Sequence, residues 1–514
     1  MKNTKILAMA CLTAMMVSVF SGCQKKGSEQ GTDGIVKLKW WTNLYSHIAQ
    51  TATNFGEVEF YKELSERTGV EFEFIHPTVG QEDEQFNIMI SSGDLPDLIE
   101  RDFTKYKGGP QKAIDEKIII GLDSYIDNNA PNYKKILSEH PNWDKQVKTD
   151  DGKHYVFASF RGDESLMCWF GPQIRKDLLD KAGLSLPETI EEWDNTLRKF
   201  KEMGIDYPIT GSGLDMNSTF SGAFGVGEKY YVDGNTVKYG ILEPGYKDYI
   251  ALLAKWYKDD LLDPDFFAQD GKSLDYKITT GKVGAYMGAV GGSMGKYLPV
   301  LKEQGWTLSG TKYPVLNKGD KPGFGQKDFA YYPMTSVAIT TKCKNPDAAV
   351  KFLDYGYGEE GHMLYNFGIE GISYNIENDY PKYTDLILKN PDGLSIQHAM
   401  ARYMASVYCG PFVQDKRYFE QYMPYDEQKE AVSRWMEQEP DHRLPTISFN
   451  QEETELVANL STEINAYINE NLLKFITGQS GMDKYDKFTA TLKTMGMDKL
   501  IDANQKALIR YKAR

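Results

Sequence analysis

Cysteine is scarce in this sequence, and its spacing matches neither a metal-binding nor a redox motif. The chain holds five cysteines in 514 residues. Without a C-x-x-C pair or a dense, even-numbered set, neither a zinc site nor a disulfide framework is indicated. Cys11 lies in the N-terminal apolar run. Cys168, Cys343 and Cys409 are expected to be buried as small apolar side chains.

A basic excess is also missing. The chain carries 59 Lys and Arg against 73 Asp and Glu, for a formal net charge of −14. Nucleic acid is therefore excluded as the main partner, because nothing offsets the charge of its phosphates. A chain of 514 residues exceeds what one hydrophobic core usually supports, so two or more lobes are expected. Aromatic residues make up 13%, and an excess over core packing would suit sugars or other flat-faced ligands.

Long apolar runs are limited to one near the N-terminus. Ile6–Phe20 follows Lys2 and Lys5 and is too short for a comfortable membrane span, which is typical of a signal peptide. Ser21 and Gly22 then directly precede Cys23. This ending resembles a bacterial lipobox, although Phe20 stands where leucine is more usual.

The lipobox pattern predicts a lipoprotein signal peptide at residues 1–22, with cleavage before Cys23 and lipid on its sulfur. Several acyl chains on one residue would anchor the protein stably to a membrane. Residues 23–34 would then be the lipidated cysteine and a polar, flexible tether. The alternative is an ordinary signal peptide followed by an incidental cysteine.

The first part of the mature chain alternates between strand and helix patterns. Such alternation predicts βαβ units, a largely parallel sheet and an α/β fold. The expected strands are Ile35–Trp41, Val70–Ile75 and Leu98–Ile99, and the expected helices are Asn54–Thr68 and Gln85–Ser91. Ligands of such sheets bind outside the carboxyl ends of the strands. Trp41, Thr42, Asn43 and Arg101 occupy those positions.

A stretch after Asp150 predicts either a crossing between two lobes or an ordinary hairpin inside one domain. Asp151-Gly152 is a strong two-residue turn, and His154–Phe160 is rich in aromatic and β-branched residues. After a polar break, the apolar run Leu166–Phe170 ends at Gly171-Pro172, and a helix with Ile174 on its apolar face is expected next. Phe329–Thr340 is a second extended candidate for a crossing.

Local signals also predict elements in the rest of the chain. Thr189 and Glu192 form a capping box before a helix, and Asp233-Gly234 is the turn of a hairpin over Tyr230–Tyr239. Apolar spacing predicts a strand at Gly284–Gly288 and helices at Tyr246–Leu262, Leu274–Thr280, Asn345–Tyr357, Leu456–Phe475, Tyr485–Met495 and Leu500–Tyr511.

Motifs of catalysis are nearly absent. Gly291–Gly295 matches G-x-S-x-G after a predicted strand, which leaves a secreted serine hydrolase with Ser293 as nucleophile as one alternative. No His-Gly-Gly oxyanion loop, phosphate loop or H-E-x-x-H motif is present. Glycines in this turn would equally let a ligand approach the backbone. No pair of carboxylates is singled out for glycoside hydrolysis.

Several short stretches, in their order and spacing, resemble one family. The chain is similar to the family-one extracellular solute-binding proteins of ABC importers, and within them to the LipO/LplA-type lipoproteins. The stretches are Ser91–Asp97, Asp151–Lys153, Ile174–Gly183, Asp259–Asp265, Gly281–Ala285, Phe352–Tyr355, Gly368–Gly371 and Lys474–Gly478.

The resemblance implies a two-lobed periplasmic-binding-protein-like fold of type II, similar to maltose-binding protein, with a hinge between the lobes. One lobe would comprise residues 35–158 and 333–410, and the other residues 160–330 and 411–514. It implies a monomer without catalysis or a cofactor, which closes on an oligosaccharide and delivers it to an ABC permease. The protein would sit at the extracellular face of the bacterial cytoplasmic membrane, held by its lipid anchor.

One departure from the family concerns calcium. Relatives often carry an Asp/Asn/Gly-rich loop after the helix that matches Trp193–Phe200, whereas here Lys201–Gly204 leads directly into Ile205–Pro208. Only Asp206 offers a carboxylate there, and calcium prefers six to eight oxygen ligands. No metal is therefore expected at that position.

The candidate ligand-binding residues combine aromatic faces with planar polar groups, which suit the C–H face and hydroxyl rim of a sugar. They are Trp41, Asn43, Arg101, Arg161, Trp169, Tyr286, Ser293, Tyr331, Tyr332 and Tyr374, with Trp169 favoured. Core packing is the alternative for each aromatic residue, and a structural ion pair for each arginine. A surface lipoprotein that binds peptide or protein without transport also remains open.

Overall fold

The computed structural model describes residues 36–211, 215, 218–405, 410–439 and 442–514. The predicted signal peptide, lipidated Cys23, the tether and Cys409 lie outside these residues. Across the described ranges, no helix is both long and apolar enough to cross a membrane.

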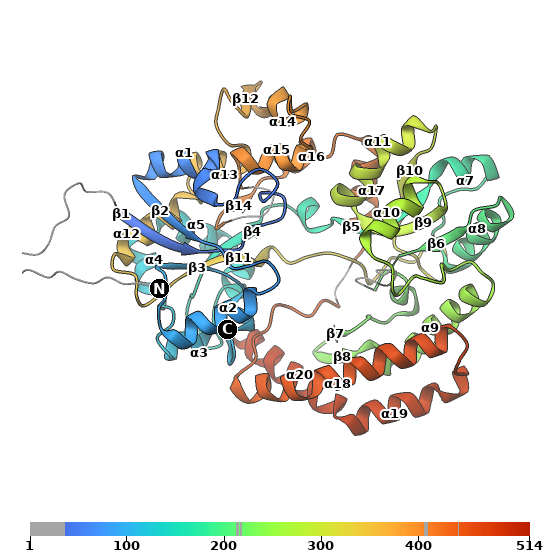
Figure 1. The fold of residues 1–514 in the computed structure, drawn as a ribbon. Helices are drawn as coiled ribbons and strands as arrows, with labels where there is room; N and C mark the ends of the chain where they lie inside the picture. Colours follow the sequence, from blue (N-terminus) through green and yellow to red (C-terminus); the bar gives the residue numbers. More distant parts are fainter. Residues whose placement is uncertain (1–35, 212–214, 216–217, 406–409, 440–441) are drawn as a thin grey trace, which may run out of the picture. The chain divides into compact units, whose positions relative to one another are not determined.

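A six-stranded mixed sheet forms the first half of the fold, in the order β14-β4-β11-β3-β1-β2 (Figure 1). Its strands are β1 (Val36–Trp41), β2 (Val70–Ile75), β3 (Leu98–Glu100), β4 (Phe157–Arg161), β11 (Tyr331–Ile339) and β14 (Val413–Gln414). β1 is parallel to β2 and to β3, as predicted. The prediction of a largely parallel sheet is confirmed with one exception: β11 enters from far along the chain and pairs antiparallel with both β3 and β4, while β14 pairs parallel with β4.

Helices accompany this sheet and complete its core. They are α1 (Glu59–Thr68), α2 (Glu82–Ser92), α3 (Gly109–Asp115), α4 (Asp123–Asn129), α5 (Pro131–Glu139), α6 (Pro141–Gln146), α12 (Pro346–Tyr355) and α13 (Glu359–Phe367). α1 ends at Gly69, whose φ of 66° lies in the left-handed region that glycine adopts without a Cβ penalty. The hydrophobic cluster of this half draws its buried residues from positions 38–160 and 331–412.

A four-stranded sheet in the order β10-β5-β9-β6 organises the second half. Its strands are β5 (Phe170–Arg175), β6 (Tyr207–Thr210), β9 (Val283–Ala289) and β10 (Leu308–Gly310), and its helices α7 (Lys176–Ala182), α8 (Ile190–Glu202), α9 (Pro244–Lys258), α10 (Gly271–Thr279), α11 (Lys296–Glu303) and α17 (Asp426–Trp435). α8 begins with the predicted capping box of Thr189 and Glu192. Trp193 and Trp256 are fully buried in the core of this half.

The stretch after Asp150 crosses between the two sheets. β4 belongs to the six-stranded sheet and β5 to the four-stranded sheet, so the hairpin alternative is wrong. The expected strand end at Gly171-Pro172 is also wrong, because both residues lie inside β5. Ile174, expected in a helix, pairs with Ala285 of β9. This pairing overrides the apolar spacing, and the helix begins only at Lys176.

The second crossing, predicted at Phe329–Thr340, lies earlier in the chain: residues 311–330 join β10 to β11, and β11 itself belongs to the six-stranded sheet. The proposed boundaries of the lobes stay a prediction. A third hydrophobic cluster unites Phe367 and Met400 with Tyr286, Leu298 and Trp435, so it draws on ranges assigned to both lobes.

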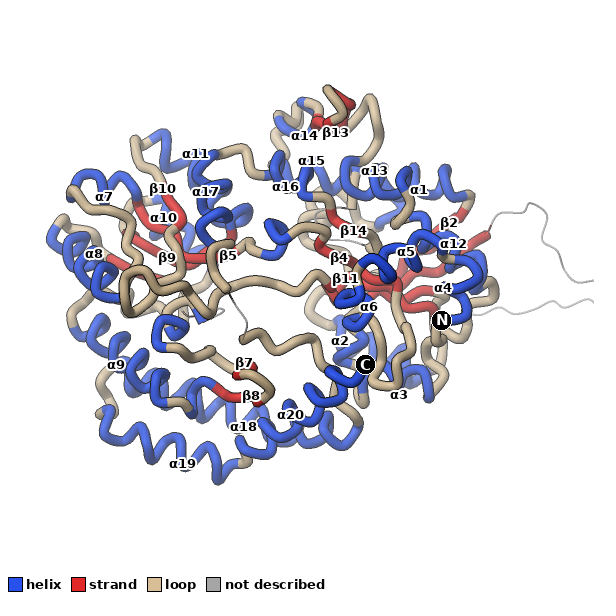
Figure 2. Tube along the Cα trace, turned by 180° about the vertical axis from the view of Figure 1, so that it is seen from behind, coloured by secondary structure: helices blue, strands red, loops and turns tan. Residues whose placement is uncertain are grey.

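The C-terminal segment is helical, as predicted, and ends the fold. It consists of α18 (Gln451–Ile476), α19 (Tyr485–Met495) and α20 (Met497–Ala513). α18 contacts α9, α19 and α20, and the two views show these helices beside one another (Figures 1 and 2). Ile464, Ile468 and Phe475 of the predicted apolar stripe are buried. Arg510 of α20 contacts Asp150 (Nε to Oδ2, 2.7 Å).

Smaller elements were predicted only in part. The hairpin with Asp233-Gly234 at its turn is confirmed as β7 (Tyr230–Asp233) and β8 (Thr236–Tyr239). No local signal predicted the elements between α13 and α17. These are β12 (Tyr374–Glu377), β13 (Tyr380–Tyr383), α14 (Asp385–Leu388), α15 (Ile396–Tyr403) and α16 (Lys416–Tyr422), besides β14.

Candidate functional site

A cavity of about 400 Å³ lies where the connection between the two sheets meets a glycine-rich turn. Its volume is within the range of sites that bind small molecules. Its walls come from β11, β14 and α16, from the end of β4, from the segment before β5, and from the turn that follows β9. The lining residues are Ser159, Phe160, Arg161, Leu166, Trp169, Ala289, Val290, Gly291, Gly292, Asp328, Tyr332, Thr335, Phe412, Gln414, Tyr418, Phe419 and Tyr422.

Arg161 ends β4 and is held in the cavity wall by three contacts. Its Nη2 lies 2.8 Å from Oδ2 of Asp328, and its Nη1 donates to the carbonyl of Leu166 (3.0 Å). Its guanidinium carbon stands 5.0 Å from the centroid of the Tyr332 ring, which is a cation–π arrangement. Most of the charged end is thus engaged by the protein itself.

Trp169 is fixed by two side chains from the second connection between the sheets. Its indole Nε1 donates to Oδ2 of Asp328 (2.8 Å), and its backbone N–H donates to Oε1 of Gln326 (2.7 Å). Gln326 also donates to the carbonyl of Met167 and to Oδ1 of Asp328 (2.8 and 2.9 Å). Because an indole has a single N–H donor, this ring offers a ligand only its apolar faces.

A π-helical turn over Val290–Gly295 follows β9 and contains the G-x-S-x-G match. Ser293 does not line the cavity, and its side chain lies against β9: a Cβ built on Gly288 would stand 2.9 Å from its Oγ. Gly291 and Gly292 do line it. A Cβ on Gly291 would come within 2.5 Å of the Tyr422 ring, whereas one on Gly292 would meet nothing within 4 Å.

These two adjacent glycines give a matched test of how tightly the cavity wall is packed. We expect Gly291→Ala to lower the free energy of unfolding by about 1–3 kcal/mol, since the Tyr422 ring must move. Gly292→Ala should change it by less than about 1 kcal/mol, because its methyl group enters open space. Chemical denaturation of both variants measures the difference. Equal effects would show that Gly291 does not contact Tyr422 as described.

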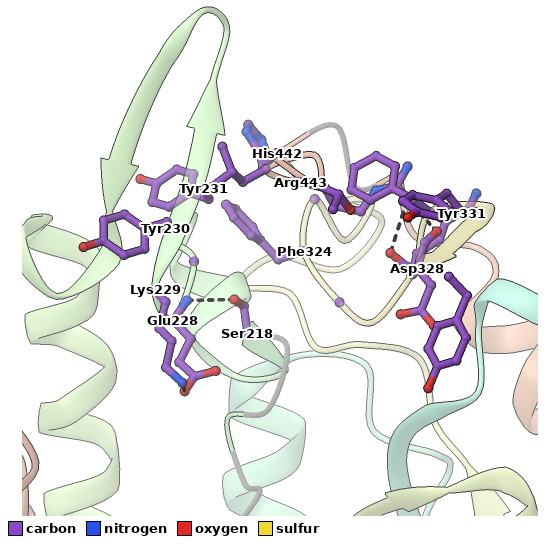
Figure 3. A pocket seen from close by; sticks show the side chains of 18 of the residues that line it. Ser218, Glu228, Lys229, Tyr230, Tyr231, Phe324, Asp328, Tyr331, His442 and Arg443 are labelled. Atoms are coloured by element: carbon purple, nitrogen blue, oxygen red, sulfur yellow. Dashed lines mark hydrogen bonds and ion pairs between the residues drawn. The ribbon is translucent and has the colours of Figure 1, made fainter. Parts of the chain in front are cut away.

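A second cavity, of about 580 Å³, adjoins the first and shares Asp328 and Tyr332 with it. Figure 3 shows its side chains, among them Tyr231, Phe324 and His442. Phe324 and His442 are stacked, with ring centroids 4.7 Å apart, and Tyr231 meets Phe324 edge-on at 5.4 Å. These rings pack against one another, so their faces are less open to a ligand than that of Trp169.

Three of the predicted ligand-binding residues, Arg161, Trp169 and Tyr332, therefore line one cavity. Tyr331 lines the neighbouring cavity, and its Oη lies 3.3 Å from Oη of Tyr155. As this Tyr331 phenol is buried, its pKa is raised well above the usual value.

The remaining candidates lie outside both cavities. Trp41 is 4% exposed and packs against Phe86, and Arg101 pairs with Asp83 (2.5 Å) while its guanidinium covers the same Phe86 ring. Asn43 is partly buried just after β1.

Tyr286 and Tyr374 are 2% and 5% exposed, in the third hydrophobic cluster. Each packs edge-on or tilted against another ring, Tyr297 and Phe367 respectively. Their assignment to the ligand stays a prediction.

Burial shifts the pKa of two further groups, Cys168 and Glu100. Burial raises the pKa of the Cys168 thiol to about 11, which agrees with its predicted role as an apolar side chain. Burial also raises the pKa of Glu100, at the end of β3, to about 8, and the hydrogen bond from Tyr45 opposes this shift only in part.

Within the part of the chain that the structure describes, no cluster of three or more His, Cys, Asp or Glu is suited to a metal ion. Asp206, the carboxylate considered for calcium, pairs with Lys282 (3.2 Å). The absence of calcium at Asp206 stays a prediction.

The residues of the candidate site that the sequence did not predict are chiefly Asp328 and Gln326. Asp328 lies 159 residues from Trp169 and stands in a loop without periodicity, so no local pattern marks it. No local pattern marks Gln414, Tyr418 or Tyr422 either. Gln414 lies in the unpredicted strand β14, and Tyr418 and Tyr422 follow it. Only the fold brings these residues to Trp169.

Comparison with known proteins identifies the family. The model of the bacterial extracellular solute-binding protein family matches residues 52–363, more than half of the chain. The protein belongs to this family, as the sequence stretches predicted.

Individual relatives agree with this assignment. The chain is 26% identical over 498 residues to the fructooligosaccharide ABC transporter substrate-binding protein FusA of Streptococcus pneumoniae serotype 4, covering 88% of this chain and 86% of that protein. It is 21% identical over 420 residues to the lipoprotein LipO of Bacillus subtilis, covering 77% and 78%. LipO represents the branch predicted from the sequence.

A solved structure confirms the fold. The alginate-binding protein AlgQ2, determined without calcium ion, superposes with a TM-score of 0.73 at 22% identity, covering 93% of this chain and 98% of that chain. The predicted type II solute-binding-protein fold is therefore confirmed.

Proposed function

We infer that this protein captures an oligosaccharide in the cavity around Trp169 and delivers it to the permease of an ABC importer. The observation that carries this inference is the fixed indole of Trp169, which lines a cavity between two connections that join the sheets. Aromatic faces with a few fixed polar groups are what a pyranose or furanose ring requires. The name of the relative FusA states a fructooligosaccharide as its substrate, which supports the same ligand class.

Capture would be a binding event without chemical conversion. The two lobes, residues 35–158 with 333–410 and residues 160–330 with 411–514, would close about their connections on a ligand that contacts both. The lipid on Cys23 would hold the protein at the extracellular face of the membrane, next to its permease. In support, segments 162–169 and 311–330 each join one sheet to the other.

Trp169→Ala tests the cavity as the binding site. We expect the variant to bind its oligosaccharide about thirtyfold more weakly than the wild type, since an aromatic anchor in a pocket is worth about 2 kcal/mol. Isothermal titration calorimetry against neutral and acidic oligosaccharides, including fructooligosaccharides, measures the dissociation constants. Trp169→Phe, which keeps an apolar face but loses the hydrogen bond to Asp328, should lie between the two.

Trp306→Ala is the matched control. Trp306 is also partly exposed, but it packs against the guanidinium of Arg175 (4.3 Å) outside the cavity, so its loss should leave the affinity unchanged. Equal losses in the Trp169 and Trp306 variants would contradict the placement of the site. Wild-type protein that binds no oligosaccharide, and from which mass spectrometry recovers a peptide, would favour the surface lipoprotein alternative.

A further inference from the structure

The charges that line the Trp169 cavity are few and already paired. Of its lining residues, Arg161 carries the one positive charge and Asp328 the one negative charge. The two side chains contact each other at 2.8 Å, and they are 16% and 32% exposed. The cavity therefore presents no net charge to a ligand.

Asp328 uses both carboxylate oxygens within the protein. Oδ2 receives Trp169 Nε1 and faces Arg161 Nη2, both at 2.8 Å, while Oδ1 accepts from Gln326 (2.9 Å). Arg161 in turn directs Nη1 to Leu166 and has its Nε buried, without a partner among the residues described. Arginine binds a carboxylate strongly through two parallel N–H groups, and one side of this fork is already taken by Asp328.

A ligand carboxylate would thus meet an unfavourable site. Burying a carboxylate is costly unless a positive charge and hydrogen bonds compensate for its lost water. Here Asp328 already neutralises Arg161, and its own charge would repel a second carboxylate beside it. Hydroxyl groups carry no such cost, because they need only single donors or acceptors.

We propose that the Arg161–Asp328 pair makes this cavity selective for uncharged oligosaccharides over uronates, with Asp328 as the residue that sets the specificity. This proposal rests on the proposed oligosaccharide-binding function. It also separates the chain from AlgQ2, a similar fold whose name states alginate, a polymer of uronates, as its ligand. Asp328 acts as a positioning residue: it holds the Trp169 ring and neutralises Arg161.

The test compares two classes of ligand on the purified protein. One set comprises neutral fructo-, gluco-, galacto- and manno-oligosaccharides, and the other comprises oligogalacturonates and alginate oligosaccharides of the same lengths. We expect the wild type to bind one neutral sugar at least about tenfold more tightly than any uronate, the equivalent of one unfavourable charge contact.

Asp328→Asn should reverse part of this preference. Asparagine keeps an oxygen that can accept from the indole of Trp169, but it leaves the charge of Arg161 uncompensated. Affinity for uronates should rise about tenfold and fall again with added salt, while affinity for the neutral sugar changes by only a few-fold. A merely structural role of Asp328 would lower both affinities together.

Asp259→Asn is the matched control, because Asp259 forms an ion pair with Arg198 outside the cavity. Like Asp328→Asn, it removes one negative charge, but it should leave the ratio of the affinities for uronates and for the neutral sugar unchanged. If the wild type binds uronates as tightly as neutral sugars, the charge proposal is wrong and oligosaccharide binding stands. If it binds neither class, the proposed function itself fails. The wild-type comparison decides the question even if the Asp328 variant does not fold.

Discussion

Replacing Lys277 with methionine should lower the free energy of unfolding by about 3–5 kcal/mol, because it leaves a buried carboxylate without its partner. Lys277 is 6% exposed, and Asp263 is fully buried. The Nζ of Lys277 lies 2.6 Å from Oδ2 of Asp263 and 3.2 Å from Oδ2 of Asp265. Thr210, at the end of β6, donates to the same Asp263 oxygen, so the pair fixes α10 to the four-stranded sheet. Urea denaturation at neutral pH measures the loss.

The double variant Lys277→Met/Asp263→Asn identifies the cause of that loss. It removes the isolated charge along with its partner, so we expect it to recover part of the stability that the single variant loses. Lys506→Met is the exposed control: Lys506 and Asp502 are 61% and 60% exposed, and such pairs contribute less than about 1 kcal/mol. A double variant no more stable than Lys277→Met would show that lost packing, rather than the charge of Asp263, causes the effect.

Signals only a few residues long predicted several parts of the fold correctly. The capping box of Thr189 and Glu192 marks the start of α8, and Asp233-Gly234 marks the β7–β8 turn. These signals work because they satisfy backbone groups locally, whatever surrounds them. By contrast, Ile174 has helical spacing but lies in β5, because its pairing with Ala285 is a contact across 111 positions.

The candidate site, too, depends on contacts that no local signal predicts. Trp169 was favoured because an aromatic residue in a predicted crossing suits a cleft, and it does line the cavity. Trp41 has an equally suitable position at the end of a strand, yet it is buried against Phe86. The difference is set by which neighbours cover each ring. Asp328 and Gln326, which hold Trp169, reach it only through the fold.

Glu100 has the most strongly perturbed environment among the carboxylates at the strand ends of the six-stranded sheet. Its side chain is 2% exposed in β3, and Oε1 accepts from Oη of Tyr45 (3.1 Å). Burial raises the pKa of Glu100 to about 8, against 4.5 for the free side chain. At neutral pH the folded protein therefore keeps a proton on Glu100 that the unfolded chain has released.

The sign of the resulting pH dependence is fixed by this difference. Below pH 4.5 both states are protonated and Glu100 costs nothing, but between about pH 4.5 and 8 the unfolded state gains by ionising, so stability falls as pH rises. Glu100→Gln removes the titration and keeps an oxygen for Tyr45. We expect the variant to be nearly as stable as the wild type at pH 4.5, and more stable by an amount of the order of 4 kcal/mol at pH 8.

Guanidinium denaturation of both proteins at pH 4.5, 6 and 8 measures this difference directly. Other buried groups, such as His47, whose pKa burial lowers to about 3, titrate in both proteins and cancel in the comparison. Glu470→Gln, at a side chain that is 63% exposed, should show a difference from wild type that stays within about 1 kcal/mol at all three pH values. A stability difference for Glu100→Gln that does not grow with pH would mean that Glu100 ionises in the folded state. Its charge would then have to be compensated at the carboxyl ends of β1 and β3, where Asn43 and Arg101 were predicted to meet a ligand.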